Sequence, residues 1–227
     1  MNSAIIVAAG KSERMGAGTD KAFLSLGSRP LVAWSLLAFE QCPDIDQMVL
    51  VIRKEQQLAA RSVAQMFGIS KLRAIVAGGV RRQDSVANGL AALDPETRIV
   101  AVHDGARPCI TSDLISETIR SAKRLGSGVA ASRVVDTIKY VERGTAVDRT
   151  LERDKLWAVQ TPQSFKLDLL RRAYAKVAER GAVVTDEAAA VELLGEPVRL
   201  VEWPKPNLKI TTAEDLPLAA AVLRIQG

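Results

Sequence analysis

Histidine and cysteine are scarce in this sequence, and the scarcity excludes several kinds of site. His103 is the single histidine, and Cys42 and Cys109 are the two cysteines, with no CxxC motif. One histidine excludes a histidine-rich zinc site and most histidine relays unless His103 is itself the base; we expect a satisfied structural histidine instead. The cysteines predict free thiols that pack as small, partly buried hydrophobes, as is typical of a reducing compartment.

Long hydrophobic runs are also missing. The longest, such as Ala4–Ala9 and Leu216–Leu223, fall well short of the roughly 20 residues that span a bilayer. No basic segment precedes the first of them, so we expect neither a membrane span nor a signal peptide. We therefore predict a cytoplasmic protein.

Neither charge nor aromatic content favours a nucleic-acid partner. The 31 Lys and Arg exceed the 26 Asp and Glu to give a net charge of +5, and basic residues stand together only in pairs such as Arg81-Arg82. Aromatic residues make up only 4% of the chain. A nucleic-acid binder usually gathers positive charge on one face and stacks bases on aromatic rings. The dispersed excess fits a small polyanionic substrate better.

The remaining sequence is typical of a globular α/β protein. Its 227 residues are 48% hydrophobic and 25% charged, which predicts one domain, 1–227, that folds without disulfides or a structural metal. Apolar runs indicate strands at Ser3–Ala9, Met48–Ile52, Leu72–Ala77, Ile99–Val102, Gly128–Val135, Leu156–Val159, Val198–Trp203 and Asn207–Ile210. Helical patterns occur at Pro30–Gln41, Glu55–Phe67, Gln83–Leu93, Thr111–Leu125, Leu167–Ala178 and Glu187–Leu194, and a capping box at Thr211–Glu214 opens a last helix. This alternation predicts an open, mostly parallel sheet flanked by helices, with right-handed crossovers.

One segment breaks this pattern. Asp136–Leu151 (DTIKYVERGTAVDRTL) alternates weakly about a turn at Arg143-Gly144 and has no strong hydrophobic face. It is either an arm that projects from the domain and finds its cover on another subunit, or an ordinary edge hairpin. The residues alone leave both interpretations open.

Gly10–Asp20 (GKSERMGAGTD) follows the first strand and has features of a phosphate-binding loop. It is not a Walker A loop, since Ile5 stands where that motif needs a glycine, and its glycine spacing does not match the dinucleotide fingerprint. Its glycines free backbone N–H groups to approach phosphates, and Lys11, Arg14 and Lys21 add positive charge. We favour a clamp for a nucleoside triphosphate at the carboxyl end of the sheet over a solvated basic loop.

A second candidate constellation is HDGARP at 103–108, directly after a buried strand. Asp104 stands at the carboxyl end of that strand, where a carboxylate facing a phosphate loop is well placed to hold Mg²⁺. The planar fork of Arg107 suits a second phosphate. The alternative for Asp104 is a capping role in a turn.

Eight motifs of this chain occur together, in this order, in one enzyme family. They are AAGKSERMG from Ala8, Asp20-Lys21, GGVRRQDSV from Gly78, HDGARP from His103, VVDTIK from Val134, LWAVQTPQ from Leu156, TDEA from Thr185 and NLKITTAEDL from Asn207. On these motifs, which extend over essentially the whole chain, the sequence resembles the 2-C-methyl-D-erythritol 4-phosphate cytidylyltransferases of the non-mevalonate isoprenoid pathway. The resemblance implies a Rossmann-like fold whose protruding β-arm, 136–151, forms a homodimer.

The resemblance also implies the reaction. The enzymes of this family are nucleotidyltransferases that move CMP from CTP to the acceptor's 4-phosphate, with Mg²⁺ as cofactor, giving 4-CDP-2-C-methyl-D-erythritol and pyrophosphate. A phosphate monoester is largely ionised near neutral pH, so the chemistry needs cations rather than a strong general base. Two alternatives remain: a related ribitol-5-phosphate cytidylyltransferase, and a nucleotide-binding regulatory protein without turnover, against which the presence of Arg14 and Lys21 argues.

Site residues follow from the resemblance by position. Arg14 and Lys21 match the groups that stabilise the family's transition state, and Asp104 matches the carboxylate associated with Mg²⁺ and substrate. The segments around CTP match Ala8, Ala9, Gly10, Gly79, Asp84 and Ser85. The groups around the methylerythritol phosphate match Arg107, Thr137, Arg153, Thr161, Thr185 and Lys209, and Arg153 and Lys209 are counted as catalytic.

Two positions depart from the family's pattern. Ser12 stands where a second loop glycine is usual, and Asp20 stands where a proline commonly precedes the lysine. Neither departure removes a charged catalytic group.

Overall fold

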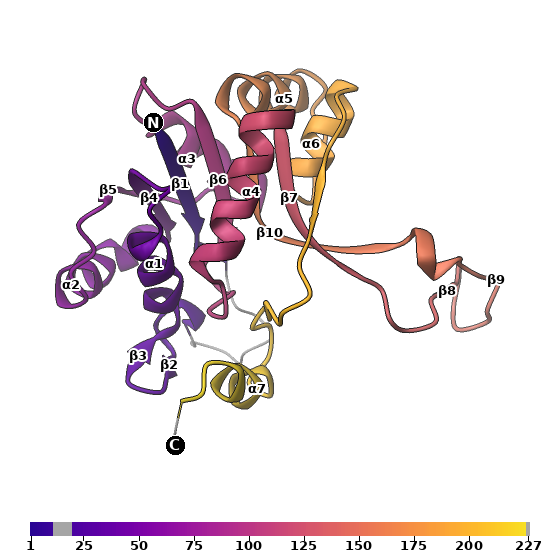
Figure 1. Cartoon of the computed structure of the whole chain (residues 1–227), viewed down its shortest axis with the longest axis horizontal. Helices are drawn as coiled ribbons and strands as arrows, with labels where there is room; N and C mark the ends of the chain where they lie inside the picture. The colour runs from indigo at the N-terminus through magenta and orange to yellow at the C-terminus, as the bar shows by residue number, and fades with distance from the viewer. Residues whose placement is uncertain (11–19, 226–227) are drawn as a thin grey trace.

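A seven-stranded sheet forms the centre of the computed structural model, which describes residues 1–10 and 20–225 (Figure 1). The strand order is β11-β7-β10-β6-β1-β4-β5. The strands are β1 (Asn2–Val7), β4 (Gln47–Ile52), β5 (Leu72–Ala77), β6 (Ile99–Asp104), β7 (Ser127–Arg133), β10 (Trp157–Lys166) and β11 (Leu200–Glu202). Only β10 runs antiparallel to its neighbours in this sheet, β6 and β7. The predicted α/β fold with a mostly parallel sheet is confirmed.

Helices cover both faces of the sheet, which explains the buried apolar runs in the middle of β1, β4 and β6. The helices are α1 (Leu31–Gln41), α2 (Gln57–Met66), α3 (Arg82–Ala91), α4 (Ser112–Leu125), α5 (Leu167–Glu179), α6 (Glu187–Leu194) and α7 (Asp215–Val222). Ile6 of β1 belongs to the core that α1, α2 and α4 cover on one face, whereas Ile5 belongs to the core that α3, α5 and α6 cover on the other. Side chains alternate between the faces of a strand, so adjacent residues of β1 serve two separate cores.

Side-chain caps open two of the helices. The Thr111 hydroxyl accepts from the Leu114 N–H at the start of α4, and the Asp186 carboxylate accepts from the Ala189 N–H at the start of α6. Gly126 ends α4 with φ 91°, a left-handed conformation that glycine adopts without a Cβ clash. None of the helices within 1–10 and 20–225 is long and apolar enough to cross a membrane.

Tight glycine turns bring the loops after β1 and β5 together. A Cβ at Gly78 would overlap the Cβ of Ala9, and a Cβ at Gly79 would overlap that of Asp84. Only glycine permits this close approach. The two loops therefore meet at the carboxyl ends of their strands, beside the end of β6.

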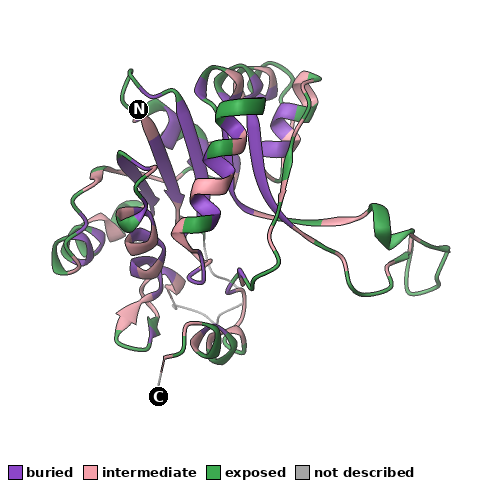
Figure 2. Ribbon diagram, in the orientation of Figure 1, coloured by how far each residue is buried: buried purple, intermediate pink, exposed green. Residues whose placement is uncertain are grey.

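The segment 136–151 is an arm that projects from the body of the molecule (Figure 1). Its short strands β8 (Lys139–Tyr140) and β9 (Arg149–Thr150) pair only with each other in their own two-stranded sheet, and Gly144 forms the turn with φ 66°. None of the residues 136–155 is buried (Figure 2). The edge-hairpin interpretation is wrong, because no strand of the central sheet pairs with the arm.

Three predicted elements differ from the structure. The predicted strand Asn207–Ile210 is an irregular segment that joins no sheet. The predicted strand Leu156–Val159 is part of the longer β10, whose pairing with β7 shifts register between Val159 and Gln163 around Pro162. Proline has no N–H to donate to a neighbouring strand. The sequence therefore predicted that the strand ends before Pro162, whereas β10 continues to Lys166.

The capping box expected at Thr211–Glu214 is also wrong. Glu214 occupies the N-cap position of α7 without a side-chain cap bond. Instead the Asp215 carboxylate accepts from the N–H groups of Thr211 and Thr212 and from the Thr211 hydroxyl, at 2.6–2.9 Å. The Asp215 carboxylate thus fixes the turn that precedes α7 and does not cap the N–H groups of the helix itself.

Candidate active site

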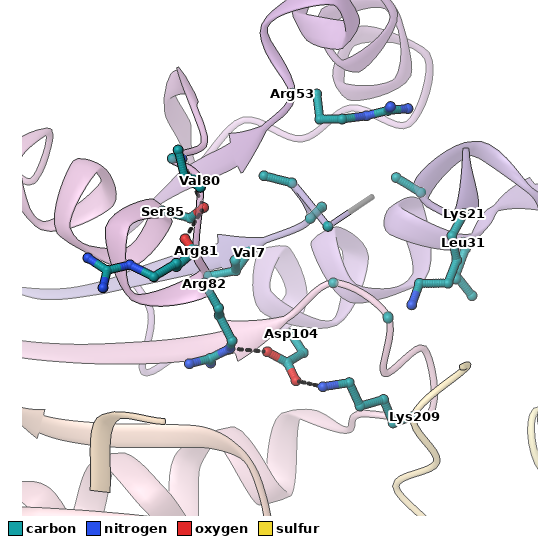
Figure 3. Close-up of a pocket in the computed structure, with 17 residues that line it drawn as sticks. Val7, Lys21, Leu31, Arg53, Val80, Arg81, Arg82, Ser85, Asp104 and Lys209 are labelled. Atoms are coloured by element: carbon teal, nitrogen blue, oxygen red, sulfur yellow. Dashed lines mark hydrogen bonds and ion pairs between the residues drawn. The ribbon is translucent and has the colours of Figure 1, made fainter. Parts of the chain in front are cut away.

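A cleft of about 370 Å³ opens at the carboxyl ends of β1, β5 and β6 (Figure 3). Backbone of three glycine-containing turns forms much of its wall, and the charged residues of the described lining are five cations and one carboxylate. The lining residues include Ala8, Ala9, Gly10, Lys21, Arg53, Gly79, Arg81, Arg82, Ser85, Asp104, Gly105 and Lys209. The structure thus brings together most of the residues predicted around the nucleotide.

Asp104 is the carboxylate of this cleft. Arg82 Nε lies 3.0 Å from Asp104 Oδ1, and Lys209 Nζ lies 2.7 Å from Asp104 Oδ2. In Figure 3 the two cations reach the carboxylate from opposite sides. Burial alone would raise the pKa of Asp104, but the charges of Arg82 and Lys209 outweigh it and hold that pKa well below the usual range. The carboxylate is therefore ionised throughout the neutral range.

The other end of Arg82 is bound by a second carboxylate that lies outside the cleft. Arg82 Nη1 and Nη2 donate to Glu187 Oε1 and Oε2 at 2.8 and 3.0 Å, and the Glu187 side chain has 0% exposure. The Tyr174 hydroxyl donates to Glu187 Oε1 at 3.0 Å. Burial lowers the pKa of Arg82, but the charges of Glu187 and Asp104 raise it above its ordinary value overall.

Lys21 faces the cleft from the short 3-10 helix η2 (Lys21–Phe23), and its ammonium donates to the Ile210 carbonyl oxygen at 3.0 Å. Asp20 caps this helix by accepting from the Ala22 N–H at 3.1 Å. The Asp20 carboxylate also pairs with Arg53 at 3.0 Å. Where the family usually has a proline, this chain fixes the approach to Lys21 with a cap and an ion pair.

The turn after β5 is held by its own side chains. The Gly79 N–H donates to the Ser85 hydroxyl at 3.0 Å, and that hydroxyl donates to the Arg81 carbonyl at 3.2 Å. Asp84 accepts from the Arg81 backbone N–H and from the Arg81 guanidinium at 2.8–3.0 Å. Asp84 is not among the residues that line the cleft, whereas Arg81 is.

A neighbouring groove of about 530 Å³ lies between β7, β10 and the segment 203–209. Its lining includes Arg107, Arg133, Gln160, Trp203, Lys205, Asn207 and Lys209. Lys209 lines both the groove and the cleft. Arg107 Nη1 donates to the Asn207 carbonyl at 2.7 Å, while its Nε is buried without a hydrogen-bond partner. Burial lowers the pKa of Arg107 from its ordinary value, but a guanidinium remains charged at neutral pH.

His103 and Thr161 lie beneath this groove. The Thr161 hydroxyl accepts from the Asp104 N–H at 3.0 Å and lies 3.2 Å from His103 Nδ1, and His103 Nε2 lies 3.3 Å from the Arg107 carbonyl. Burial lowers the pKa of His103 to about 3, so the ring is neutral at physiological pH. The prediction of a structural histidine is confirmed, and Thr161 lines neither the cleft nor the groove.

Three further predicted residues, all within the described part of the chain, line neither the cleft nor the groove. Thr137 lies on the arm and Arg153 lies at its base, where Arg153 Nη1 donates to the Val135 carbonyl at 2.7 Å. Thr185 is exposed just before α6 and lines neither the cleft nor the groove. Arg14, like Ser12, lies outside the described residues.

The sequence analysis missed Arg53, Arg82 and Glu187. Arg82 and Glu187 stand inside two motifs that it quoted, GGVRRQDSV and TDEA. Their partnership joins positions 105 residues apart, and local spacing carries no signal of such a pair.

A divalent metal fits this cleft only together with phosphate. The described residues hold no group of three or more His, Cys, Asp or Glu side chains that could bind an ion. Asp104 is a single carboxylate, and its oxygens already accept from Arg82 and Lys209. Mg²⁺ often takes one or two carboxylates and completes its shell with water and substrate phosphates. Asp104 fits that arrangement and does not fit an ion held by protein alone.

Comparison with known proteins gives one consistent result. The profile of the family described as "IspD: 2-C-methyl-D-erythritol 4-phosphate cytidylyltransferase" matches residues 2–225. The protein of that name from Alkaliphilus oremlandii is 43% identical over 223 residues, which are 98% of this chain and 94% of that protein. The protein of the same name from Pelotomaculum thermopropionicum is also 43% identical, over 98% of this chain and 94% of that protein.

Solved structures agree with the sequence comparison. The crystal structure of 4-diphosphocytidyl-2C-methyl-D-erythritol synthase from Anaerococcus prevotii has a TM-score of 0.87 and 32% identity, covering 98% of this chain and 96% of that one. The structure of 2-C-methyl-D-erythritol 4-phosphate cytidylyltransferase from Thermus thermophilus has a TM-score of 0.80 and 33% identity, covering 97% of this chain and 98% of that one. Sequence and fold thus point to the same relatives over nearly the whole length.

Proposed function

The chain belongs to the 2-C-methyl-D-erythritol 4-phosphate cytidylyltransferase family, and from this premise we propose that CTP binds in the cleft and the acceptor phosphate in the groove. The enzyme transfers CMP from CTP to 2-C-methyl-D-erythritol 4-phosphate, in the pathway to isoprenoid precursors. The products are 4-CDP-2-C-methyl-D-erythritol and pyrophosphate.

One observation carries the proposed placement: Lys209 lines both cavities. An in-line transfer requires the acceptor oxygen and the α-phosphorus of CTP to meet between two binding sites. The ammonium of Lys209 stands at that junction, 2.7 Å from Asp104. It is therefore placed to contact both anions where they meet.

The reaction we derive is attack by a 4-phosphate oxygen on the α-phosphorus, with pyrophosphate as the leaving group. The phosphate monoester is largely ionised near neutral pH and needs no base. The single histidine is buried and neutral, so it does not serve as one. The obstacle is the negative charge that gathers at pentavalent phosphorus, and Arg14, Lys21 and Lys209 supply the opposing positive charge.

We assign the nucleotide contacts according to the loop of the cleft on which each residue lies. Ala8, Ala9 and Gly10 follow β1 and offer backbone to the phosphates. Gly79, on the turn after β5, and Ser85, in the first turn of α3, lie on the side assigned to the cytosine. Asp84 contributes by holding Arg81, the cleft residue that its carboxylate binds.

Asp104 is the residue that would hold Mg²⁺. When bound, the ion supplies charge neutralisation for the triphosphate. The ionised state of Asp104, maintained by Arg82 and Lys209, keeps a carboxylate ready for that role. Lys209 shares the same carboxylate, so we expect the ion and the ammonium to divide it between them.

The acceptor site takes its remaining groups from two chains. Arg107 lies in the groove, with Thr161 buried beneath it, and Thr185 lies at the start of α6. Thr137 lies on the arm and Arg153 at its base, in a stretch with no buried residue from 136 to 155. An arm with so little cover is poorly stable alone in water. We propose that it embraces a second subunit in a homodimer and delivers Thr137 and Arg153 to that subunit's groove.

Location and domain organisation are part of this proposal. We place the enzyme in the cytoplasm as one nucleotidyltransferase domain, 1–227, with 136–151 as its dimerisation arm. The support is the single central sheet and two buried free thiols, Cys42 and Cys109, which suit a reducing compartment.

The acceptor is tested by offering each candidate. The purified protein is incubated with CTP, Mg²⁺ and either 2-C-methyl-D-erythritol 4-phosphate or ribitol 5-phosphate, and pyrophosphate release is followed. We expect release with the methylerythritol compound at a kcat/KM at least 100-fold higher. A preference for ribitol 5-phosphate would overturn the assignment, but the compared relatives give that alternative no support. Nucleotide binding without pyrophosphate release would favour the regulatory alternative.

A further inference from the structure

We propose that Glu187 is a positioning residue for the transfer reaction, acting on Asp104 and Lys209 through Arg82. The proposal rests on the function assigned above to the cleft. Glu187 is not among the residues that line the cleft, and no motif analysis assigned it a role.

Glu187 is a charge in an unusual place. As the first residue of α6 it would ordinarily face solvent and benefit the helix dipole there, yet its side chain has 0% exposure. Removing a carboxylate from water costs several kcal/mol unless it is paired and hydrogen-bonded. Here a two-point contact with Arg82 and the Tyr174 hydroxyl provide that compensation.

The start of α6 is fixed to the central sheet, so Glu187 is a rigid anchor. Gln163 of β10 donates to Asp186 Oδ2 at 2.9 Å and accepts from the Ala188 N–H at 3.0 Å. These bonds hold both sequence neighbours of Glu187. Since Tyr174 of α5 fixes one of its oxygens as well, the carboxylate has little freedom to move.

From this anchor, an unbroken chain of contacts leads into the cleft. Glu187 holds the fork of Arg82, Arg82 Nε donates to Asp104 Oδ1 at 3.0 Å, and Lys209 donates to Asp104 Oδ2 at 2.7 Å. Two cations and two carboxylates balance in charge. Arg82 therefore uses one nitrogen on Asp104 and leaves the second oxygen to Lys209.

Removal of the Glu187 charge should change how Arg82 and Lys209 share the two oxygens of Asp104. The Arg82 fork would lose its stronger partner and turn toward Asp104, where two-point binding competes with Lys209 for the carboxylate. Lys209 would leave the junction between cleft and groove. A displacement of about 1 Å at a reacting centre costs on the order of 10²-fold in rate.

The test is the Glu187→Gln variant, which keeps the side-chain volume, with Glu192→Gln as its matched control. Glu192 belongs to the same helix but is exposed. We expect Glu187→Gln to lower kcat by about 10- to 100-fold, with the KM for CTP within threefold of wild type and Glu192→Gln unchanged. A kcat within twofold of wild type, measured well below the unfolding temperature, would overturn the proposal.

A double-mutant cycle separates positioning from general destabilisation. If Glu187 acts through Arg82, adding Glu187→Gln to Arg82→Lys should lower kcat by less than twofold further, because the path is already broken. If the kcat losses of the two single variants multiply in the double variant, Glu187 acts independently of Arg82 and the inference is refuted. Tyr174→Phe removes the other contact of Glu187 and keeps its charge. We expect a lower unfolding temperature with kcat within threefold; a kcat loss equal to that of Glu187→Gln would assign the effect to stability.

Wild-type turnover separates the positioning inference from the proposed function on which it rests. Without pyrophosphate release by the wild-type protein, the proposed function fails and the positioning role of Glu187 fails with it. With wild-type release and an unaffected Glu187→Gln variant, only the positioning inference fails.

Discussion

The ammonium of Lys21 lies 3.0 Å from the carbonyl oxygen of Ile210, although 189 residues separate them. The same short segment, 207–210, also supplies Lys209 to Asp104. It is fastened to the body through Asn207, whose Nδ2 donates to Gln160 and Thr161, and through the Ile210 N–H, which donates to Ala106. The end of the nucleotide loop and the junction with the groove are therefore aligned on a single irregular segment.

Lys21→Ala should lower turnover far more than CTP binding. The charge of Lys21 matters most when phosphorus becomes pentavalent, so we expect kcat to fall by about 10²–10³-fold and the Kd for CTP to change only a few-fold. The same result is expected for Arg14→Ala. Steady-state kinetics and calorimetric titration with CTP check both, with Lys123→Ala at the opposite end of the sheet as control. Near-normal turnover in either variant would remove that residue from the catalytic group.

Asp104→Asn should raise the Mg²⁺ concentration required for half-maximal activity. An amide is a neutral and weaker ligand than a carboxylate, and it leaves Arg82 and Lys209 with one negative partner fewer. The measurement is pyrophosphate release over a Mg²⁺ titration at saturating CTP. If activity falls but the Mg²⁺ midpoint stays unchanged, Asp104 positions substrate and does not bind the ion.

The sequence predicts the central strands well because helices bury them on both faces. Every residue of β4 is buried, and all of them except Gln47 are apolar. The caps at Thr111 and Asp186 were also predictable, since a cap acts within three residues.

Contacts between distant segments were not predictable in this way. Asn207–Ile210 has the composition of a short strand, yet its backbone bonds to loops rather than to a sheet edge. The pairing of Arg82 with Glu187 depends on how α3 meets α6 in space. The resemblance located most of the cleft, but it gave no physical reason to separate Arg82 from the adjacent Arg81, whose partner is the local Asp84.

His103 should make the stability of the protein depend on pH in a definite direction. Its pKa is about 3 in the folded protein because it is buried, against 6.5 for a free side chain. Below pH 6.5 the unfolded chain therefore binds a proton that the folded protein does not, and stability falls as the pH falls.

The free energy of unfolding should decrease by about 1.2 kcal/mol between pH 6 and pH 5, mostly above the range where carboxylates titrate. Because the chain has one histidine, His103→Gln should abolish most of this slope. Urea unfolding at several pH values measures it. An equal slope in the variant would show that His103 is not the titrating group.

The arm allows a test of function through assembly. If Arg153 reaches the groove of the second subunit, each active site combines Arg153 from one chain with Lys21 from the other. Arg153→Ala and Lys21→Ala proteins should each be inactive alone. After subunit exchange, a mixed dimer has one site with both lesions and one with neither.

Mixing the two inactive proteins should therefore restore activity. Random exchange makes about half of the dimers mixed, so recovery should approach roughly one quarter of the wild-type sites, given closed two-fold symmetry. Native mass spectrometry verifies the exchange, and a mixture of Lys21→Ala with Asp104→Asn, two residues lining the same cleft, is the control that should not recover. Since both of those lesions fall in the cleft of their own chain, no mixed dimer contains an intact site. Verified exchange with activity at background in the Arg153→Ala mixture would refute the shared site and leave Arg153 acting within its own subunit.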